Sequence, residues 1–187
     1  MRPGKPIGLL AALILALALV GCGDHSLILR VDLLSFLTTA ETHAHYGPIP
    51  GGITDSVTVA SSRTINLLPG INDITTVSDV SVDAVGTFVN ATGSGSGVVK
   101  IFVSAEGTDP FTTDTSPIVL PITLAPAATD SVAVTISGDS ELANLFLGKT
   151  AEIGIRLTLQ SATGPLEGDF ALTTLKAIVT AKQDVIN

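Results

Sequence analysis

Glu41, His43 and His45 are the side chains of this sequence whose types and spacing come nearest to a chemical site. If residues 39–46 are extended, alternate side chains share one face, and all three would point the same way about 6.6 Å apart. Two imidazoles and a carboxylate are the ligand set of zinc or of an open iron site. A metal usually draws its ligands from several elements, however, and His25 is the one other histidine. The pattern therefore predicts an exposed polar strand without a metal or cofactor, and the three residues stay as candidate ligands.

The other residue types argue against an enzyme. A serine or cysteine hydrolase needs a histidine as its base, and the chain has three in all. The Gly- and Ser-rich residues 93–97 have Val98 where a dinucleotide-binding loop needs Gly, and Gly95 where a nucleophile elbow needs Ser. With no Trp and one Tyr, the chain has too few aromatic side chains to line a glycosidase cleft. We therefore expect a non-enzymatic protein.

The first residues of the chain have the pattern of an export signal. Arg2 and Lys5 precede a run of apolar and Gly residues from Ile7 to Val20. As a helix, this run would rise about 21 Å at ~1.5 Å per residue, which is short of the ~30 Å hydrocarbon core of a bilayer. The run ends in Leu19-Val20-Gly21-Cys22, which resembles the lipobox of bacterial lipoproteins.

This resemblance covers residues 1–22 and implies how the chain is processed. Residues 1–21 would be a signal peptide that is cleaved off, and Cys22 would carry a diacylglycerol on its thiol and usually an acyl chain on its new amine. In the Gram-negative members of this class, Asp directly after the Cys tends to retain the protein at the inner membrane. Gly23 at this position therefore favours the outer membrane. We expect residues 22–26 to be a short lipid tether and residues 27–187 to be a single domain.

The composition limits the partners of the mature chain. Removal of residues 1–21 leaves seven basic and 17 acidic residues, which is a formal net charge of −10. This acidic balance argues against binding nucleic acid and against adhesion to anionic lipid headgroups through charge. Because Cys22 is the only Cys, disulfides cannot stabilise the domain. The membrane, reached through the lipid on Cys22, is the expected contact, and the residues do not name a protein partner.

Alternation of apolar and polar residues predicts most of the strands. Residues 153–159 alternate most clearly, and residues 55–67 and 131–137 follow the same pattern. Residues 27–37 are strongly apolar and are predicted to form a strand covered on both faces. Residues 118–124 are predicted to form an edge strand, because Pro121 cannot donate a hydrogen bond to a ladder.

Gly, Pro and capping residues predict where these elements end. The predicted turns are a loop at residues 47–52, a type II turn at Pro69-Gly70, a hairpin connection at residues 92–97 and a reversal at residues 164–168. The strand before the hairpin connection is expected to slip its phase at Val85-Gly86, where a bulge fits. Residues 139–147 are the one helix candidate, with Asp139 or Ser140 as N-cap and Gly148 as the stop.

Together these elements predict an all-β fold, an antiparallel β-sandwich of about seven to nine strands with one short helix; a closed β-barrel is the alternative. We expect a lipid-anchored cell-envelope protein with a non-enzymatic structural or binding domain. One alternative is a carrier of an apolar ligand, held in a cavity beneath Leu142, Leu145 and Phe146. Another is a metal-binding envelope protein that uses Glu41, His43 and His45.

Overall fold

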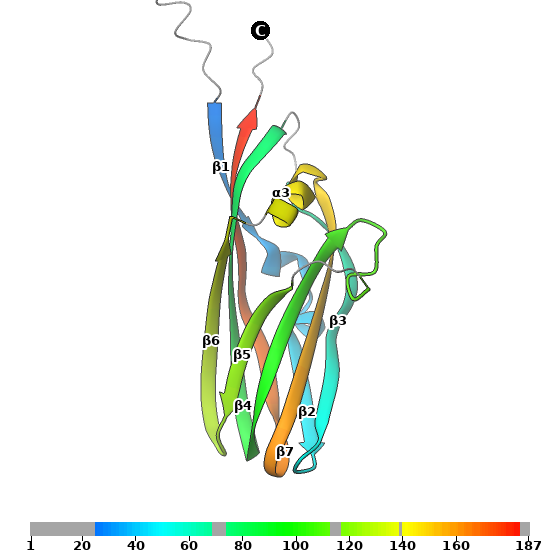
Figure 1. Cartoon of the computed structure of the whole chain (residues 1–187), viewed down its shortest axis with the longest axis vertical. Helices are drawn as coiled ribbons and strands as arrows, with labels where there is room; N and C mark the ends of the chain where they lie inside the picture. The colour runs from blue at the N-terminus through cyan, green and yellow to red at the C-terminus, as the bar shows by residue number, and fades with distance from the viewer. Residues whose placement is uncertain (1–24, 69–73, 113–116, 139, 184–187) are drawn as a thin grey trace, which may run out of the picture.

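The computed structural model describes residues 25–68, 74–112, 117–138 and 140–183 (Figure 1). The described strands are β1 (His25–Asp32), β2 (His43–Ile49), β3 (Thr54–Asn66), β4 (Ile74–Ala105), β5 (Ile118–Leu124), β6 (Ala128–Ser137) and β7 (Thr150–Gln183). In the same described residues, the helical elements are the short 3-10 helix η1 (Leu33–Phe36), the single turn α2 (Thr39–Thr42) and the helix α3 (Ser140–Leu147). All strand pairs between these elements are antiparallel.

The fold is built on one long ribbon of two strands. β4 and β7 pair along their whole length, from Ile74 opposite Gln183 to Ala105 opposite Ala151. Both strands bend at the lower end of Figure 1, so the ribbon folds over onto itself and forms two layers. Two glycines allow this bend. Gly93 has a φ of +69°, a conformation that favours glycine. Gly95 has no Cβ, and a Cβ at this position would overlap the carbonyl oxygen of Gln160.

The predicted reversals at residues 92–97 and 164–168 therefore have a different form from a hairpin. The chain does change direction at both places, but residues 74–91 do not pair with residues 98–105; both stretches pair with β7. The hairpin prediction is wrong because each strand turns the corner while it keeps its hydrogen-bonding neighbour. The predicted irregularity at Val85-Gly86 is present in the ladder, but Thr173 of β7 is the extra residue, since Val85 lies opposite Thr174 and Gly86 opposite Leu172.

Each arm of the bent ribbon carries further strands on its edges. The first layer contains β6, residues 74–91 of β4, residues 168–183 of β7, and then β1 and β2 end to end. The second layer contains β5, residues 95–105 of β4, residues 150–160 of β7, and β3. β5 and β6 pair only with β4 among the described strands, so the sheet is not closed. The β-sandwich is confirmed, the barrel alternative is wrong, and the strand with Pro121 is an edge strand.

The core lies between the two layers. Its most regular side is residues 153–159, where Ile153, Ile155, Leu157 and Leu159 are at most 1% exposed. The alternation read from the sequence is therefore confirmed there. The facing layer contributes apolar side chains of β4 and β7, and the Phe88 and Phe170 rings pack at a centroid distance of 5.0 Å. Burial of each large side chain of this kind stabilises the fold by roughly 1.5–3 kcal/mol.

Two helical regions accompany the strands in the part of the chain that the structure describes. The strand predicted for residues 27–37 ends at Asp32, and η1 follows it with Leu33 buried. The predicted helix is confirmed over Ser140–Leu147; Leu142 and Phe146 are 7% and 2% exposed and belong to the core, while Leu145 is partly buried. α3 covers the end of the sandwich where β1 begins (Figure 1). Asp139 and the predicted turn at Pro69-Gly70 lie outside the described residues.

Candidate functional site

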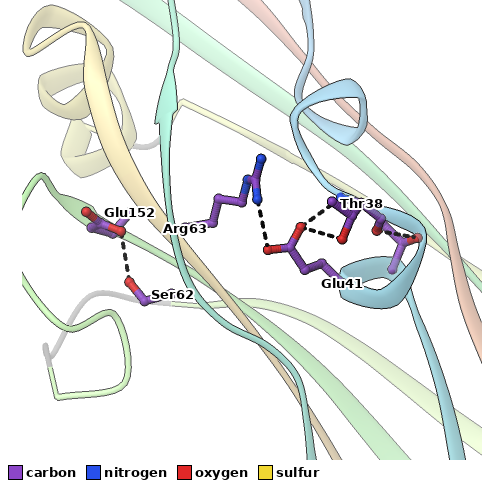
Figure 2. Close-up of polar contacts among 6 residues, drawn as sticks. Thr38, Glu41, Ser62, Arg63 and Glu152 are labelled. Atoms are coloured by element: carbon purple, nitrogen blue, oxygen red, sulfur yellow. Dashed lines mark hydrogen bonds and ion pairs between the residues drawn. The ribbon is translucent and has the colours of Figure 1, made fainter.

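The Glu41 carboxylate forms hydrogen bonds within its own segment and is not free to act as a metal ligand. It lies in α2, and its Oε2 accepts hydrogen bonds from the Thr38 backbone N–H (2.7 Å) and the Thr38 hydroxyl (2.8 Å) (Figure 2). The bond from the Thr38 backbone N–H is the side-chain half of a capping box, in which the Thr38 side chain in turn faces the Glu41 backbone N–H, and this box favours a helical turn at residues 39–42. Its Oε1 lies 3.4 Å from the Arg63 guanidinium on β3. The hydrogen bond from the Thr38 backbone, followed by the weaker effects of the Thr38 hydroxyl and Arg63, lowers the pKa of Glu41, although partial burial opposes the shift.

The two histidines point to different neighbours. Nδ1 of His43 lies 3.0 Å from the Thr42 hydroxyl and 3.1 Å from the Thr39 carbonyl oxygen, so this ring folds back onto α2. His45 lies on β2, where Nδ1 is 3.1 Å from Asp169 and Nε2 is 3.6 Å from Glu167, both on β7. The three side chains of this last contact are all more than 40% exposed, so its contribution to stability is small.

The common face expected for Glu41, His43 and His45 is therefore not formed. The expectation required residues 39–46 to be extended, but Thr38 and Glu41 close a helical turn and the strand begins only at His43. No group of three or more His, Cys, Asp or Glu side chains in the described part of the chain is placed to hold a metal ion.

A second carboxylate, Glu152, was not singled out in the sequence. Its place between Ala151 and Ile153 suggested an exposed outer face, yet only 8% of the residue is exposed. It accepts hydrogen bonds from the Thr64 hydroxyl (2.6 Å), the Ser62 hydroxyl (2.8 Å; Figure 2) and the Gly107 backbone N–H (3.5 Å). Glu152 thereby joins β7 to β3 and to the loop after β4.

The hydrogen bonds favour the charged form of Glu152. The bond from Thr64 is the largest cause and lowers the pKa of the carboxyl, helped by Ser62 and Gly107 and opposed by burial. A general acid at neutral pH needs the opposite shift. The arrangement is therefore that of a structural contact. The polar residues Ser62 and Thr64 on a predicted strand were the one sign in the sequence of a polar contact here. Their partner across the sheet, Glu152, could not be predicted from the sequence.

An open groove lies on the outer face of the second layer, near the bend of the ribbon. Its volume is about 590 Å³, and none of the residues that line it is charged. Ser96, Gln160 and Thr123 come from the three neighbouring strands β4, β7 and β5, and they also line an adjoining groove of about 470 Å³. Hydroxyl and amide groups over the apolar surfaces of Val98 and Pro121 can contact a neutral polar ligand.

The alternative of an apolar-ligand carrier placed a cavity beneath α3. Leu142 and Phe146 instead pack into the core, and residues from other elements line the grooves described above. Cys22, the expected site of lipid attachment, lies outside the described residues, and β1 begins at His25. Among the described residues, no helix is both long enough and apolar enough to cross a membrane.

No protein-family model matches the sequence, and no curated protein matches it at a significant level. Among solved structures, the chain is similar to the structure of infectious bursal disease virus, Gx strain, with a TM-score of 0.44 and 14% identity over 88% of this chain. It is also similar to a T13 particle of that virus (TM-score 0.43, 11% identity, 88% of this chain) and to a xylan-binding module (TM-score 0.27, 12% identity, 87% of this chain and 100% of the module). The chain spans 39% and 37% of the length of the two viral chains. All three TM-scores lie below 0.5, so these likenesses say nothing about what this chain binds or assembles with, and they place it in no family.

Proposed function

We propose that this protein is a lipid-anchored, non-enzymatic binding module of the cell envelope. The observation that carries the proposal is the position of the lipobox-like residues 19–22, which only two residues separate from the first strand, beginning at His25. An export signal, a lipidation motif and a folded domain then follow one another without a long linker. In a Gram-negative cell, Gly23 favours the outer membrane as the destination.

The short connection supports a fixed orientation of the domain. From Cys22 to His25 the chain spans at most about 11 Å at ~3.5 Å per residue. The start of β1 and the end of β7 are paired and lie at the same end of the long axis (Figure 1). A lipid on Cys22 would hold this end against the bilayer, and the bend of the ribbon would be the end furthest from it.

The polar residues of the described chain support a binding role over catalysis. Glu41 and Glu152 are hydrogen-bonded and kept ionised, His43 packs against α2, and His45 forms an exposed contact with two carboxylates. The uncharged groove at Ser96, Thr123 and Gln160 lies near the bend. The bend is at the opposite end of the long axis from the proposed membrane end (Figure 1). Neutral hydroxyl and amide groups suit recognition of a neutral polar partner.

Metabolic labelling with a palmitate analogue tests the anchor. We expect the wild-type chain to take up the label and to partition into the membrane fraction, and Cys22→Ala to do neither. Ser26→Ala is the matched control, because it changes a polar residue close to Cys22 and leaves the lipobox intact; it should label like the wild type. Equal labelling of Cys22→Ala and the wild type would refute the proposal. A Gly23→Asp variant tests the destination and should shift the labelled protein to the inner membrane of a Gram-negative host.

A further inference from the structure

The edge strands of the sandwich differ in how they are protected against pairing with another chain. A free strand edge is a template for a further strand, and proteins usually block it with charge, Pro or a bulge. β1 carries Arg30 and Asp32, and β2 contains Pro48 and a register shift. β3 has two register shifts and Arg63, while β5 contains Pro121. β6 has no Pro, no basic residue and no register shift.

The ladder of β6 is long and regular. Ten consecutive residues pair with β4, from Ala128 opposite Asn90 to Ser137 opposite Ser81. Within the described residues, the other side of β6 pairs with no strand. The inward-facing Val132, Val134 and Ile136 pack against the core but are only partly buried. β6 therefore offers both unpaired backbone groups and an incompletely covered apolar row.

The sequence of β5 and β6 is almost free of charge, although Asp83 of the neighbouring β4 accepts a hydrogen bond from the Thr135 hydroxyl. Residues 118–138, which we call the β5–β6 flank, contain one charged residue, Asp130, whereas charged residues make up 14% of the chain. Val89, opposite Thr129 of β6, is 49% exposed, and Val119 of β5 is 37% exposed. Depletion of charge together with exposed apolar side chains is the composition of the centre of a protein interface.

We propose that β6 pairs with β6 of a second copy of this chain, antiparallel about a two-fold axis. The inward-facing residues of the two β6 strands must lie on the same side of the joined sheet, so each must pair with an inward-facing residue of the other copy. A register centred on Val134 meets this condition. Val132 then lies opposite Ile136 of the second copy, and the hydroxyls of Ser131 and Ser137 lie opposite each other. Asp130 falls outside this ladder, so the two copies place no like charges opposite one another.

Self-pairing fits this edge better than a charged partner does. The net charge of −10 on the mature chain would attract a basic partner, but the acidic residues lie elsewhere and the β5–β6 flank offers only Asp130. Two copies of the flank would instead cover each other's apolar row and satisfy each other's backbone groups. The two first layers would join into one continuous sheet across the two-fold axis.

The antiparallel arrangement has a consequence for the anchors. β6 runs along the long axis of the molecule, and β1 begins at one end of that axis (Figure 1). A two-fold axis perpendicular to β6 therefore places the two β1 starts at opposite ends of the dimer. If Cys22 carries lipid, which rests on the proposed function, the pair would connect two membrane surfaces that face each other.

The oligomeric state in solution tests the pairing without the lipid. The mature chain with Cys22→Ser keeps every described residue, and we expect a reversible monomer–dimer equilibrium in sedimentation equilibrium, with a Kd on the order of 10–100 µM because a single strand pair is a small interface. Ala133→Lys should weaken the dimer at least tenfold, because the two new ammonium groups are diagonal neighbours on the same face of the joined sheet and repel each other. Thr58→Lys on the opposite edge strand β3 is the matched control and should leave the equilibrium unchanged. A chain that is monomeric at millimolar concentration, or a dimer that Ala133→Lys does not weaken, would overturn the inference.

Crosslinking tests the register. In the Cys22→Ser background an introduced Cys is the only thiol, and in the proposed pairing the two Val134 positions lie opposite each other at a Cα separation that a disulfide can span, about 5 Å. Val134→Cys should oxidise to a covalent dimer, whereas Thr129→Cys on the same strand should stay monomeric. Crosslinking of the two variants to the same extent would contradict the register and the specific pairing.

The lipidated protein in phosphatidylcholine vesicles tests the arrangement of the anchors. We expect vesicles that carry the wild-type lipoprotein to cluster, measured by light scattering, and vesicles that carry Ala133→Lys to remain dispersed. Absence of protein from the vesicles would count against the lipid anchor and leave the solution dimer intact. Protein that is bound to the vesicles, dimeric in solution and unable to cluster them would overturn the antiparallel placement.

Discussion

Two carboxylates lie on either side of a short stretch of β3 and illustrate two kinds of polar contact. On one side, Arg63 reaches Glu41 of α2, and on the other side Ser62 donates to Glu152 of β7 (Figure 2). The Thr64 hydroxyl also donates to Glu152. The pKa of both carboxyls is lowered, mainly by hydrogen bonds. Glu41 is part of a local turn and its side chain is 24% exposed, whereas Glu152 is 8% exposed and joins segments far apart in the sequence.

This difference shows why residue type and sequence spacing overestimated one site and missed the other. Glu41 attracted attention because two histidines follow it at alternate positions, but its hydrogen bonds come mainly from a residue three positions away. Glu152 has no such neighbours in the sequence, and its donors come from residues 62, 64 and 107. A long-range contact of this kind leaves no local pattern.

The largest effect is expected from Glu152→Ala. The substitution removes an ionised acceptor and leaves the Thr64 and Ser62 hydroxyls without their partner in a partly buried place. We expect the free energy of unfolding to fall by about 2 kcal/mol, which corresponds to roughly 4–8 °C in Tm for a domain of this size. Glu167→Ala, at an exposed contact with His45, is the matched control and should cost less than about 0.5 kcal/mol. Equal losses in the two variants would show that Glu152 is no more important than a surface acid.

The corner of the β4–β7 ribbon marks a second limit of prediction from the sequence. The alternation of Ile153 to Leu159 was sufficient to place one buried face, because burial of a strand follows from its own period. Gly93 and Gly95 correctly indicated a change of direction. Whether the strands on either side of such a bend pair with each other or with a third strand depends on the rest of the sheet, and so the hairpin was an error that local residues could not correct.

The helical turn α2 shows a local signal that was overlooked. Thr38 followed by Glu41 is the capping-box pattern, in which the acid bonds back to the residue three positions before it. The prediction of one extended segment at residues 39–46 did not take this pattern into account. It therefore placed Glu41, His43 and His45 on one face. The signal was present in the sequence, in contrast to the partners of Glu152.

A smaller effect is expected from Glu41→Ala. The substitution removes the side-chain half of the capping box and the contact with Arg63, and we expect a loss of about 1 kcal/mol. Arg63→Ala tests which of these contacts matters, because it removes the ion pair alone and should cost only about 0.3 kcal/mol. Chemical denaturation of the two variants measures both values. A larger loss in Arg63→Ala than in Glu41→Ala would mean that the contact between α2 and β3, and not the local turn, holds this region.

The pH dependence of stability should separate Glu152 from the other acids. A carboxyl whose pKa is lower in the folded than in the unfolded state stabilises the fold fully above its unfolded pKa of about 4.3. That contribution disappears as the pH falls through the folded pKa. We therefore expect the wild-type free energy of unfolding to decline between about pH 5 and pH 3. Glu152→Gln should lose part of this decline, because the amide oxygen still accepts hydrogen bonds and does not titrate. An unchanged slope in Glu152→Gln would show that the Thr64 and Ser62 bonds do not favour the charged form.

The smallest effect is expected from zinc. For a metal ion to collect Glu41, His43 and His45, Glu41 would have to leave Thr38 and Arg63, and His43 would have to leave the Thr39 carbonyl, which together would unwind α2. His45 would also have to turn away from Asp169 and Glu167. An equimolar addition of zinc should therefore leave Tm unchanged, and His43→Ala should respond in the same way as the wild type. Tight stoichiometric binding, measured by calorimetry and lost in His43→Ala, would mean that residues 39–46 rearrange around a metal. Glu41, His43 and His45 would then form a metal site. Binding that survives in His43→Ala and disappears in His45→Ala would instead place the ion at Glu167 and Asp169, on the surface of β7.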